Sequence, residues 1–242
     1  MNATLRRWRH RAAHRTVTAL STRPRLYYGV RRLTGTYDQL CVCPATELVI
    51  EGYPRSANST TVHGFLARQD RPVRVAHHKH HAAQLLQAAR WGVPAVALIR
   101  PPRAAILSML ALAEEGRRRH GGPGGRGSHV TFEDAAWAWL AFYRAILPIR
   151  DALVVAPFAR VTADLATVIE EVNERFATRF ESAPEVRTPQ PGLGWHARSN
   201  PLRREILANL DTVMQQAERE RPRLARLLAA GDALHDGLAG AP

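Results

Sequence analysis

Cysteine, lysine and long apolar runs are all scarce in this sequence of 242 residues. The two cysteines, Cys41 and Cys43, are separated by a single valine. That spacing suits neither a disulfide framework nor a four-ligand zinc site, which needs more ligands at other intervals. We interpret both as small apolar residues at the start of a strand, in a protein of the reducing cytoplasm.

No apolar run approaches the ~20 residues that a membrane-spanning helix requires. Residues 1–15 are rich in arginine and have no apolar stretch behind them, so they do not resemble a secretory signal. We therefore expect a cytoplasmic protein. A chain of this length usually forms one compact domain around a single core.

Lysine occurs once, at Lys79, although the net charge is +13. Nearly all of the positive charge therefore comes from arginine, and this excess indicates an anionic partner: nucleic acid, anionic lipid, or a phosphorylated or sulfated small molecule. Residues 1–45 form a basic amino-terminal segment, which is either a solvated arm or a contact for an acidic partner. Residues 46–242 are expected to form the folded domain.

Short apolar segments alternate with segments of helical spacing from residue 47 onward. Strands are expected at 47–53, 73–77, 94–99 and 152–156, and helices at 59–68, 82–91, 104–115, 132–146, 163–177 and 202–229. The alternation predicts a single α/β domain with a central, mainly parallel sheet flanked by helices. The aromatic helix at 132–146 is interpreted as part of the core, with an acceptor pocket as the alternative.

The segment from Glu51 to Thr61, Glu-Gly-Tyr-Pro-Arg-Ser-Ala-Asn-Ser-Thr-Thr, is the most informative about function. A strand ends there and small polar residues lead directly into a helix. The start of a helix exposes unpaired N–H groups and the positive end of its dipole, so an anion fits there. Arg55 adds a bidentate cation, and nearby hydroxyls are either further donors or ordinary helix caps. The lysine and glycines of the Walker loop are missing.

Residues 53–60, Tyr-Pro-Arg-Ser-Ala-Asn-Ser-Thr, resemble the 5′-phosphosulfate-binding loop of sulfotransferases that use 3′-phosphoadenosine 5′-phosphosulfate (PAPS) as donor. The family pattern is Tyr-Pro-Lys/Arg-Ser-Gly-(Thr/Asn)-Thr/Ser-Trp, and alanine stands here in place of the glycine. The resemblance implies a P-loop-like sulfotransferase fold. It also implies donor contacts from Arg55, Ser56, Ala57, Asn58, Ser59 and Thr60.

A second segment, 94–108, is similar to the family's 3′-phosphate motif, an apolar strand followed by Arg-x-Pro-x-x-x-x-x-Ser. A strand here delivers Arg100 at its carboxyl end, where ligands of open parallel sheets bind. The resemblance implies that Arg100 and Ser108 bind the 3′-phosphate. Taken singly, each residue has an ordinary structural explanation; their joint order and spacing favour the functional interpretation.

Four histidines, His77, His78, His80 and His81, lie between the two motifs. In the family, the second strand ends in a histidine that takes the proton of the acceptor, and the resemblance assigns this base to His78, with His80 as the alternative. A neutral imidazole at about pH 7 suits that task. Because strand neighbours face opposite sides, His77 and His78 are expected to point apart. A transition-metal site or a solvated loop are the other interpretations.

The loop 192–203 lies where sulfotransferases close over the nucleotide, so Arg198 and Arg203 are expected either to reach the 3′-phosphate or to face solvent. The resemblance covers about residues 48–203. It implies transfer of a sulfuryl group from PAPS to a hydroxyl or amine, on a small-molecule, glycan or lipid acceptor, without a metal.

Two other classes remain as alternatives. One is a P-loop kinase or nucleotide hydrolase, and the other is a non-enzymatic binder of nucleic acid or of an anionic membrane. No specific nucleic acid is expected as a partner. Peripheral contact of the basic amino-terminal segment with an anionic membrane is left open.

Overall fold

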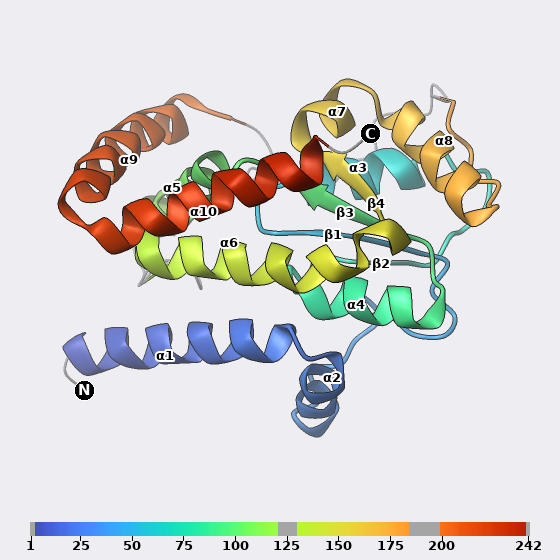
Figure 1. Cartoon of the computed structure of the whole chain (residues 1–242), viewed down its shortest axis with the longest axis horizontal. Coiled ribbons are helices and arrows are strands. Elements are labelled where there is room, and N and C mark those ends of the chain that lie inside the picture. The colour runs from blue at the N-terminus through green and yellow to red at the C-terminus, as the bar shows by residue number, and fades with distance from the viewer. Residues whose placement is uncertain (1–2, 121–129, 184–198, 241–242) are drawn as a thin grey trace.

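Four parallel strands form the central sheet of the structure, a computed structural model that describes residues 3–120, 130–183 and 199–240 (Figure 1). The strands are β1 (Leu48–Gly52), β2 (Val75–His77), β3 (Ala95–Ile99) and β4 (Val154–Pro157). Their order is β2-β1-β3-β4, and each neighbouring pair is parallel. Every expected strand is present, and the prediction of an α/β fold with a parallel sheet flanked by helices is confirmed.

Alternate residues of the central strands feed two hydrophobic cores, one on each face of the sheet. Val49 of β1 and Ala97 of β3 belong to one core, whereas Ile50 and Leu98 belong to the other. Neighbouring residues of a strand point to opposite faces, so a strand covered on both sides must be apolar throughout. All five residues of β3 are buried, as its uninterrupted apolar run predicts.

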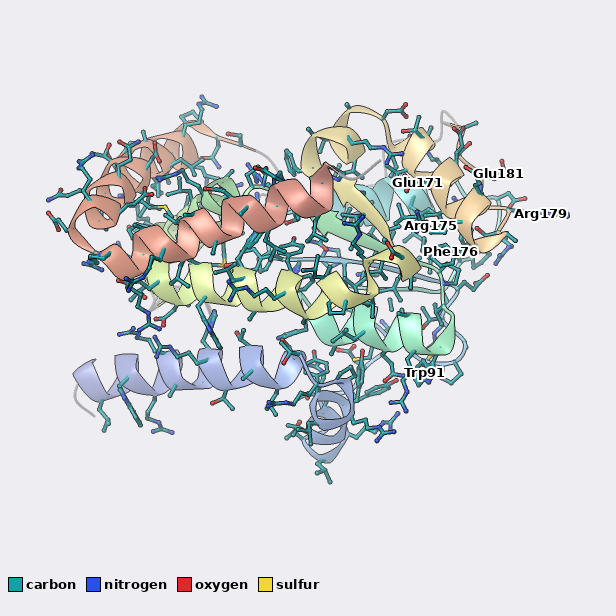
Figure 2. All side chains as sticks on the ribbon, in the orientation of Figure 1. Trp91, Glu171, Arg175, Phe176, Arg179 and Glu181 are labelled. Atoms are coloured by element: carbon teal, nitrogen blue, oxygen red, sulfur yellow. The ribbon has the colours of Figure 1, made fainter. Side chains whose placement is uncertain are left out.

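Helices cover both faces of the sheet (Figure 1). One face carries α4 (Ala82–Trp91), α5 (Pro102–His120), α6 (Phe132–Ile146) and α10 (Pro222–Ala239). The other carries α3 (Asn58–Leu66), α7 (Phe158–Ala163) and α8 (Leu165–Phe176). α9 (Pro201–Glu220) packs against α5 and α10, and a 3-10 helix (Leu147–Ala152) links α6 to β4. Side chains fill the space between these layers, with Trp91 at the outer end of α4 (Figure 2).

One of the expected helices is divided in the structure, and another begins two residues later than expected. The helix expected at 202–229 is two helices, α9 and α10, because Pro222 lacks a backbone N–H and its ring would clash with the preceding turn. The helix expected at 163–177 begins as α8 after Asp164, whose side chain accepts hydrogen bonds from two amides of the first turn, at 3.0 and 3.3 Å. α7 is a separate short helix before it.

The basic amino-terminal segment forms two helices: α1 (Ala3–Ser21) runs alongside α6, and α2 (Pro24–Leu33) packs against α4 (Figure 1). Tyr27 and Tyr28 of α2 are buried in the same core as α6. α1 is held by Asp134 of α6, a buried carboxylate that pairs with Arg11 and Arg15 at 2.7 Å each. Apolar and ionic contacts therefore both attach this segment to the rest of the protein.

The two cysteines lie in the loop before β1, and not at the start of a strand as expected. Cys41 is buried in the core beside Val42, whereas Cys43 is only half-buried. None of the helices within the described residues is both long and apolar enough to cross a membrane.

Candidate functional site

The segments that carry candidate chemistry all follow strand ends at one edge of the sheet. β1 leads into the loop 53–57, β2 leads into the histidines of 78–81, and β3 leads into Arg100. Because the strands are parallel, their carboxyl ends meet at the same edge, which is where open α/β sheets bind ligands. The fold therefore brings together three segments that are separated in the sequence.

The loop after β1 has an unusual backbone conformation. Arg55 (φ 72°) and Ala57 (φ 75°) are both left-handed, whereas Ser56 between them is not. Alternation of this kind turns successive N–H groups to one side and forms a concavity that binds anions. Glycine adopts the left-handed conformation without strain, but alanine at position 57 does so at a cost of roughly 1–2 kcal/mol.

α3 begins directly after this loop, with Ala57 as its N-cap residue. The first helical hydrogen bond runs from the Thr61 amide to the Ala57 carbonyl, at 2.9 Å. Within the part of the chain that the structure describes, the amides of Asn58, Ser59 and Thr60 have no hydrogen-bond acceptor, as is normal in the first turn of a helix. These donors and the positive end of the helix dipole favour an anion.

The hydroxyl and amide side chains of the loop divide into two groups. Ser56 is fully buried, its amide donates to the Tyr53 carbonyl at 3.2 Å, and its hydroxyl contacts α6. Asn58 Nδ2 donates to the same carbonyl at 3.3 Å. Ser59 is half-buried and Thr60 is exposed. Ser56 and Asn58 therefore hold the turn from inside, while Ser59 and Thr60 lie on its outer side.

Tyr143 of α6 ties the ends of β1 and β3 together. Its hydroxyl donates to the Leu98 carbonyl at 2.7 Å and accepts from the Tyr53 amide at 3.3 Å. Gly52 permits this close approach, since a Cβ atom there would lie 2.4 Å from the Leu98 carbonyl oxygen. Sequence reasoning missed both residues: the aromatic spacing of α6 correctly indicates core packing, but it carries no signal for the hydroxyl.

Arg55 joins the two motifs that resemble donor-binding segments. Its Nε donates to Ser108 Oγ at 3.1 Å, and its backbone carbonyl accepts a hydrogen bond from Arg100, 45 residues further along the chain, at 3.0 Å. The Arg100 guanidinium also stacks over the Phe158 ring, 4.3 Å from the ring centroid. The two motifs therefore form one contact at the sheet edge.

Arg203 brings a third guanidinium to this place. It is 3% exposed, and its Nε donates to Glu115 Oε2 at 2.6 Å. Burial, followed by the charges of Arg203 and Arg100, lowers the pKa of Arg55 to about 10, against the opposing effect of Glu115. The charges of Arg100 and Arg203 both act on Arg55, and we call Arg55, Arg100 and Arg203 the arginine cluster. Arg198, the remaining candidate, lies outside the described residues.

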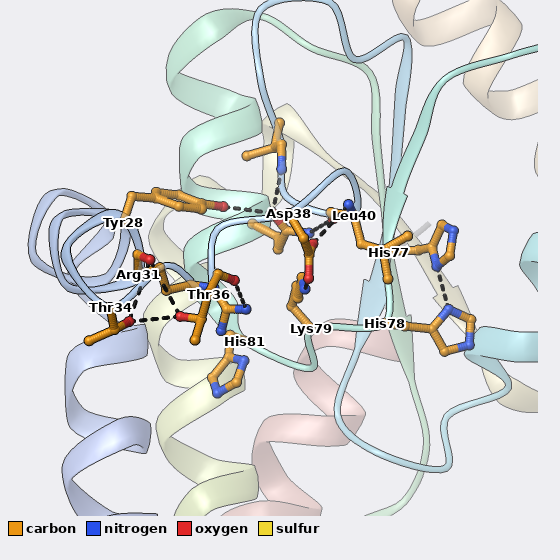
Figure 3. A network of polar contacts seen from close by, with 12 residues as sticks. Tyr28, Arg31, Thr34, Thr36, Asp38, Leu40, His77, His78, Lys79 and His81 are labelled. Atoms are coloured by element: carbon orange, nitrogen blue, oxygen red, sulfur yellow. Dashed lines mark hydrogen bonds and ion pairs between the residues drawn. The ribbon is translucent and has the colours of Figure 1, made fainter.

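The histidine segment begins where β2 ends, at His77. The expectation that His77 and His78 point to opposite sides is wrong: their ring centroids are 4.6 Å apart and their Nδ1 atoms share a hydrogen bond (Figure 3). The reason is that His78 is left-handed (φ 56°), so the alternation of an extended strand stops before it. Nε2 of His78 lies 2.9 Å from Ser59 Oγ.

His80 has a defined tautomer. Its Nδ1 lies 3.1 Å from the Gly52 carbonyl, which can only accept, so Nδ1 carries the proton and Nε2 carries the lone pair. Burial lowers the pKa of His80, and the charge of Arg55 lowers it as well, against the Gly52 hydrogen bond. His80 is therefore a neutral imidazole close to the arginine cluster. Among the described residues, its Nε2 has no hydrogen-bond partner.

Glu51 holds the backbone of the histidine segment. This carboxyl group is completely buried, and it accepts hydrogen bonds from the amides of Lys79 (2.8 Å) and His81 (3.3 Å). The side chains of these two residues leave the site: Lys79 pairs with Asp38 (Figure 3), and His81 contacts Tyr27. Burial lowers the pKa of His81 to about 3.

Comparisons of the chain with protein-family models, with curated proteins and with solved structures gave no match. Among residues 3–120, 130–183 and 199–240, no group of three or more His, Cys, Asp or Glu side chains is placed to hold a metal ion. The interpretation of the site therefore depends on its own geometry: a loop with unpaired amides, an arginine cluster and a neutral imidazole.

Proposed function

We propose that the protein is a sulfotransferase of P-loop-like fold, which transfers the sulfuryl group of PAPS to a hydroxyl or amine acceptor. The observation that carries the proposal is the contact of Arg55 with both Ser108 and Arg100. The segments 53–60 and 94–108, which resemble the two donor-binding motifs of this family, meet in that contact. Adjacent parallel strands bring the two segments to one edge of the sheet, and the hydrogen bonds of Arg55 with Ser108 and Arg100 join them there.

The donor has two anionic ends, and the site offers cations and N–H donors for both. The unpaired amides of 58–60 and the Arg55 guanidinium would bind the 5′-phosphosulfate. Arg100 and Ser108 would bind the 3′-phosphate, with Arg203 adding positive charge beside them. The excess positive charge of the arginine cluster supports a ligand with more than one anionic group.

The reaction is an in-line displacement at sulfur. The acceptor oxygen forms a bond to sulfur while the bond between sulfur and the phosphate oxygen breaks, and the acceptor's proton passes to an imidazole. The products are a sulfate ester and adenosine 3′,5′-bisphosphate. Arg55 and the loop amides would stabilise the negative charge that develops on the departing oxygen, because the fold orients them before the reaction.

His80 is the base that the contacts favour, in place of His78. The Nδ1 proton of His80 is committed to the Gly52 carbonyl, which leaves Nε2 to take the proton of the acceptor. Both ring nitrogens of His78 already have partners, His77 and Ser59. β2 ends early, at His77, and the chain then turns. His80 is the candidate base when the strand ends in this way.

Ligand-dependent thermal stability tests the proposal. Adenosine 3′,5′-bisphosphate at about 100 times its Kd should stabilise the protein by about 2.7 kcal/mol, and so raise Tm by about 5–10 °C. Adenosine 5′-phosphate should give a much smaller shift. Arg100→Ala should abolish this difference, because the 3′-phosphate then lacks its main cation, whereas Arg90→Ala, an exposed arginine on α4, should leave it intact.

Two outcomes would contradict the assignment. Equal stabilisation by both nucleotides would show that Arg100 and Ser108 do not bind a 3′-phosphate. Stronger stabilisation by ATP with magnesium would favour a P-loop kinase or hydrolase instead.

A further inference from the structure

Exposed apolar side chains are concentrated on α1 and α2. Within the described residues, nine large hydrophobic side chains are exposed, and six of them lie on these two helices. The six are Leu5, Trp8, Val17, Leu26, Val30 and Leu33. Single exposed apolar residues are ordinary, but a concentration in one segment marks an interaction surface.

α2 has two apolar faces. Tyr27 and Tyr28 form the inner face and are buried in the core. Leu26, Val30 and Leu33 follow at positions i, i+4 and i+7, so they form one stripe along the outer face. They are 53%, 42% and 89% exposed. Packing against α4 explains only the inner face, and the outer stripe has no covering partner among the described residues.

The charges around this stripe are of one sign. Residues 1–37 contain nine arginines and no aspartate or glutamate. Arg11 and Arg15 turn inward to Asp134, whereas Arg23, Arg25 and Arg32 are exposed on or beside α2. The outer stripe is therefore bordered by arginines, and residues 1–37 contribute no acidic side chain beside it.

α1 and α2 lie together along one edge of the molecule, with α6 and α4 between them and the sheet (Figure 1). The edge thus combines arginines with exposed leucine, valine and tryptophan. Amphipathic helices that lie on membranes have this combination, with apolar side chains entering the headgroup boundary, tryptophan at the interface and arginines at the lipid phosphates. Nucleic acid would use the arginines but would leave the apolar stripe exposed to water.

We propose that α1 and α2 dock the protein onto an anionic lipid surface. Leu26, Val30 and Leu33 enter the headgroup region, and the exposed arginines of both helices contact lipid phosphates. The inference does not depend on the reaction proposed above, because none of these residues belongs to the arginine cluster or to the histidine segment.

Vesicle flotation tests the docking. The full chain is mixed with vesicles of phosphatidylcholine alone, or of about three parts phosphatidylcholine to one part phosphatidylserine. Binding is expected only to the anionic vesicles. Leu33→Ser should weaken it roughly tenfold, because a large apolar side chain no longer enters the lipid. The matched control is Val213→Ser, which changes an exposed apolar residue on α9 (54% exposed) and should have no effect.

Charge variants complete the experiment. Arg23→Gln together with Arg25→Gln should weaken binding roughly fivefold for each arginine removed, whereas Arg223→Gln with Arg226→Gln on α10 should not. Absence of binding to anionic vesicles would overturn the proposal. It would also be overturned if Leu33→Ser bound as well as the unchanged protein, or if the chain self-associated through this stripe without binding vesicles. Tight binding to duplex DNA that is insensitive to Leu33→Ser, without vesicle binding, would assign the arginines to nucleic acid.

Discussion

Gly52→Ala tests the close approach of β1 and β3 beneath the candidate site. The added Cβ atom would lie 2.4 Å from the Leu98 carbonyl oxygen and 2.9 Å from the Leu98 Cβ atom. Both are backbone or backbone-attached atoms, so no flexible side chain can move away to relieve the clash, and the strands must separate. Overpacking of this kind costs about 1–3 kcal/mol, which corresponds to roughly 2–12 °C in Tm for a domain of this size.

The clash should also reach the site, since the Gly52 carbonyl orients His80 and the loop of 53–57 follows directly. We therefore expect Gly52→Ala to lower Tm in differential scanning calorimetry and to weaken nucleotide binding in calorimetric titrations. The matched control is Gly237→Ala on α10, where a Cβ atom meets nothing within 4 Å and helix propensity should raise stability by ~0.5–1 kcal/mol. An unchanged Tm for Gly52→Ala would refute the reasoning.

Three further predictions concern titratable groups. His80→Asn should lower turnover by about 100-fold or more at unchanged affinity for adenosine 3′,5′-bisphosphate, and His78→Asn should have a smaller effect. If a donor-turnover assay shows a larger loss for His78→Asn than for His80→Asn, His78 is the base. Burial would raise the pKa of Asp134, but hydrogen bonds, of which that from Arg11 is the largest, lower it to about 2. The ionised Asp134 therefore stabilises the folded state fully above ~pH 4, and this contribution is lost as pH falls toward ~2. Hydrogen exchange should show α1 losing protection over that range, and Asp134→Asn should remove the pH dependence. Burial raises the pKa of Glu51 to about 8 from the usual 4.5, so the folded protein holds a proton that the unfolded chain releases, and stability falls as pH rises from ~4.5 to ~8. Glu51→Gln should flatten that slope in urea unfolding; an unaltered slope would mean that another group is responsible.

The sheet could be predicted from the sequence because its signal is local. The apolar runs at 94–99 and 152–156 need burial on both faces, and only a parallel sheet between helix layers provides it. Helix boundaries were less well predicted where one residue decides them. Pro222 was visible in the sequence, yet the periodicity on both sides of it favoured one long helix over two.

The candidate site was only partly predictable, because its key contacts join distant segments. The motifs indicated Arg55, Arg100 and Ser108, but their hydrogen bonds depend on strand order. The arrangement of His77 and His78 depends on a left-handed residue that no pattern of alternation reveals. Glu51 is an acid in an apolar strand, and its partners are backbone amides, which have no sequence signature.

The attachment of α1 also has a consequence for the order of events during protein synthesis. Arg11 and its partner Asp134 are 123 residues apart. At a ribosomal rate of about 5–20 residues per second, roughly 6–25 seconds pass between the appearance of the arginine and that of the carboxylate. During this interval Arg11 and Arg15 of α1 lack the carboxylate with which they pair in the folded protein. The ion pairs that attach α1 to α6 can therefore form only after α6 has been synthesised, although α1 itself leaves the ribosome first.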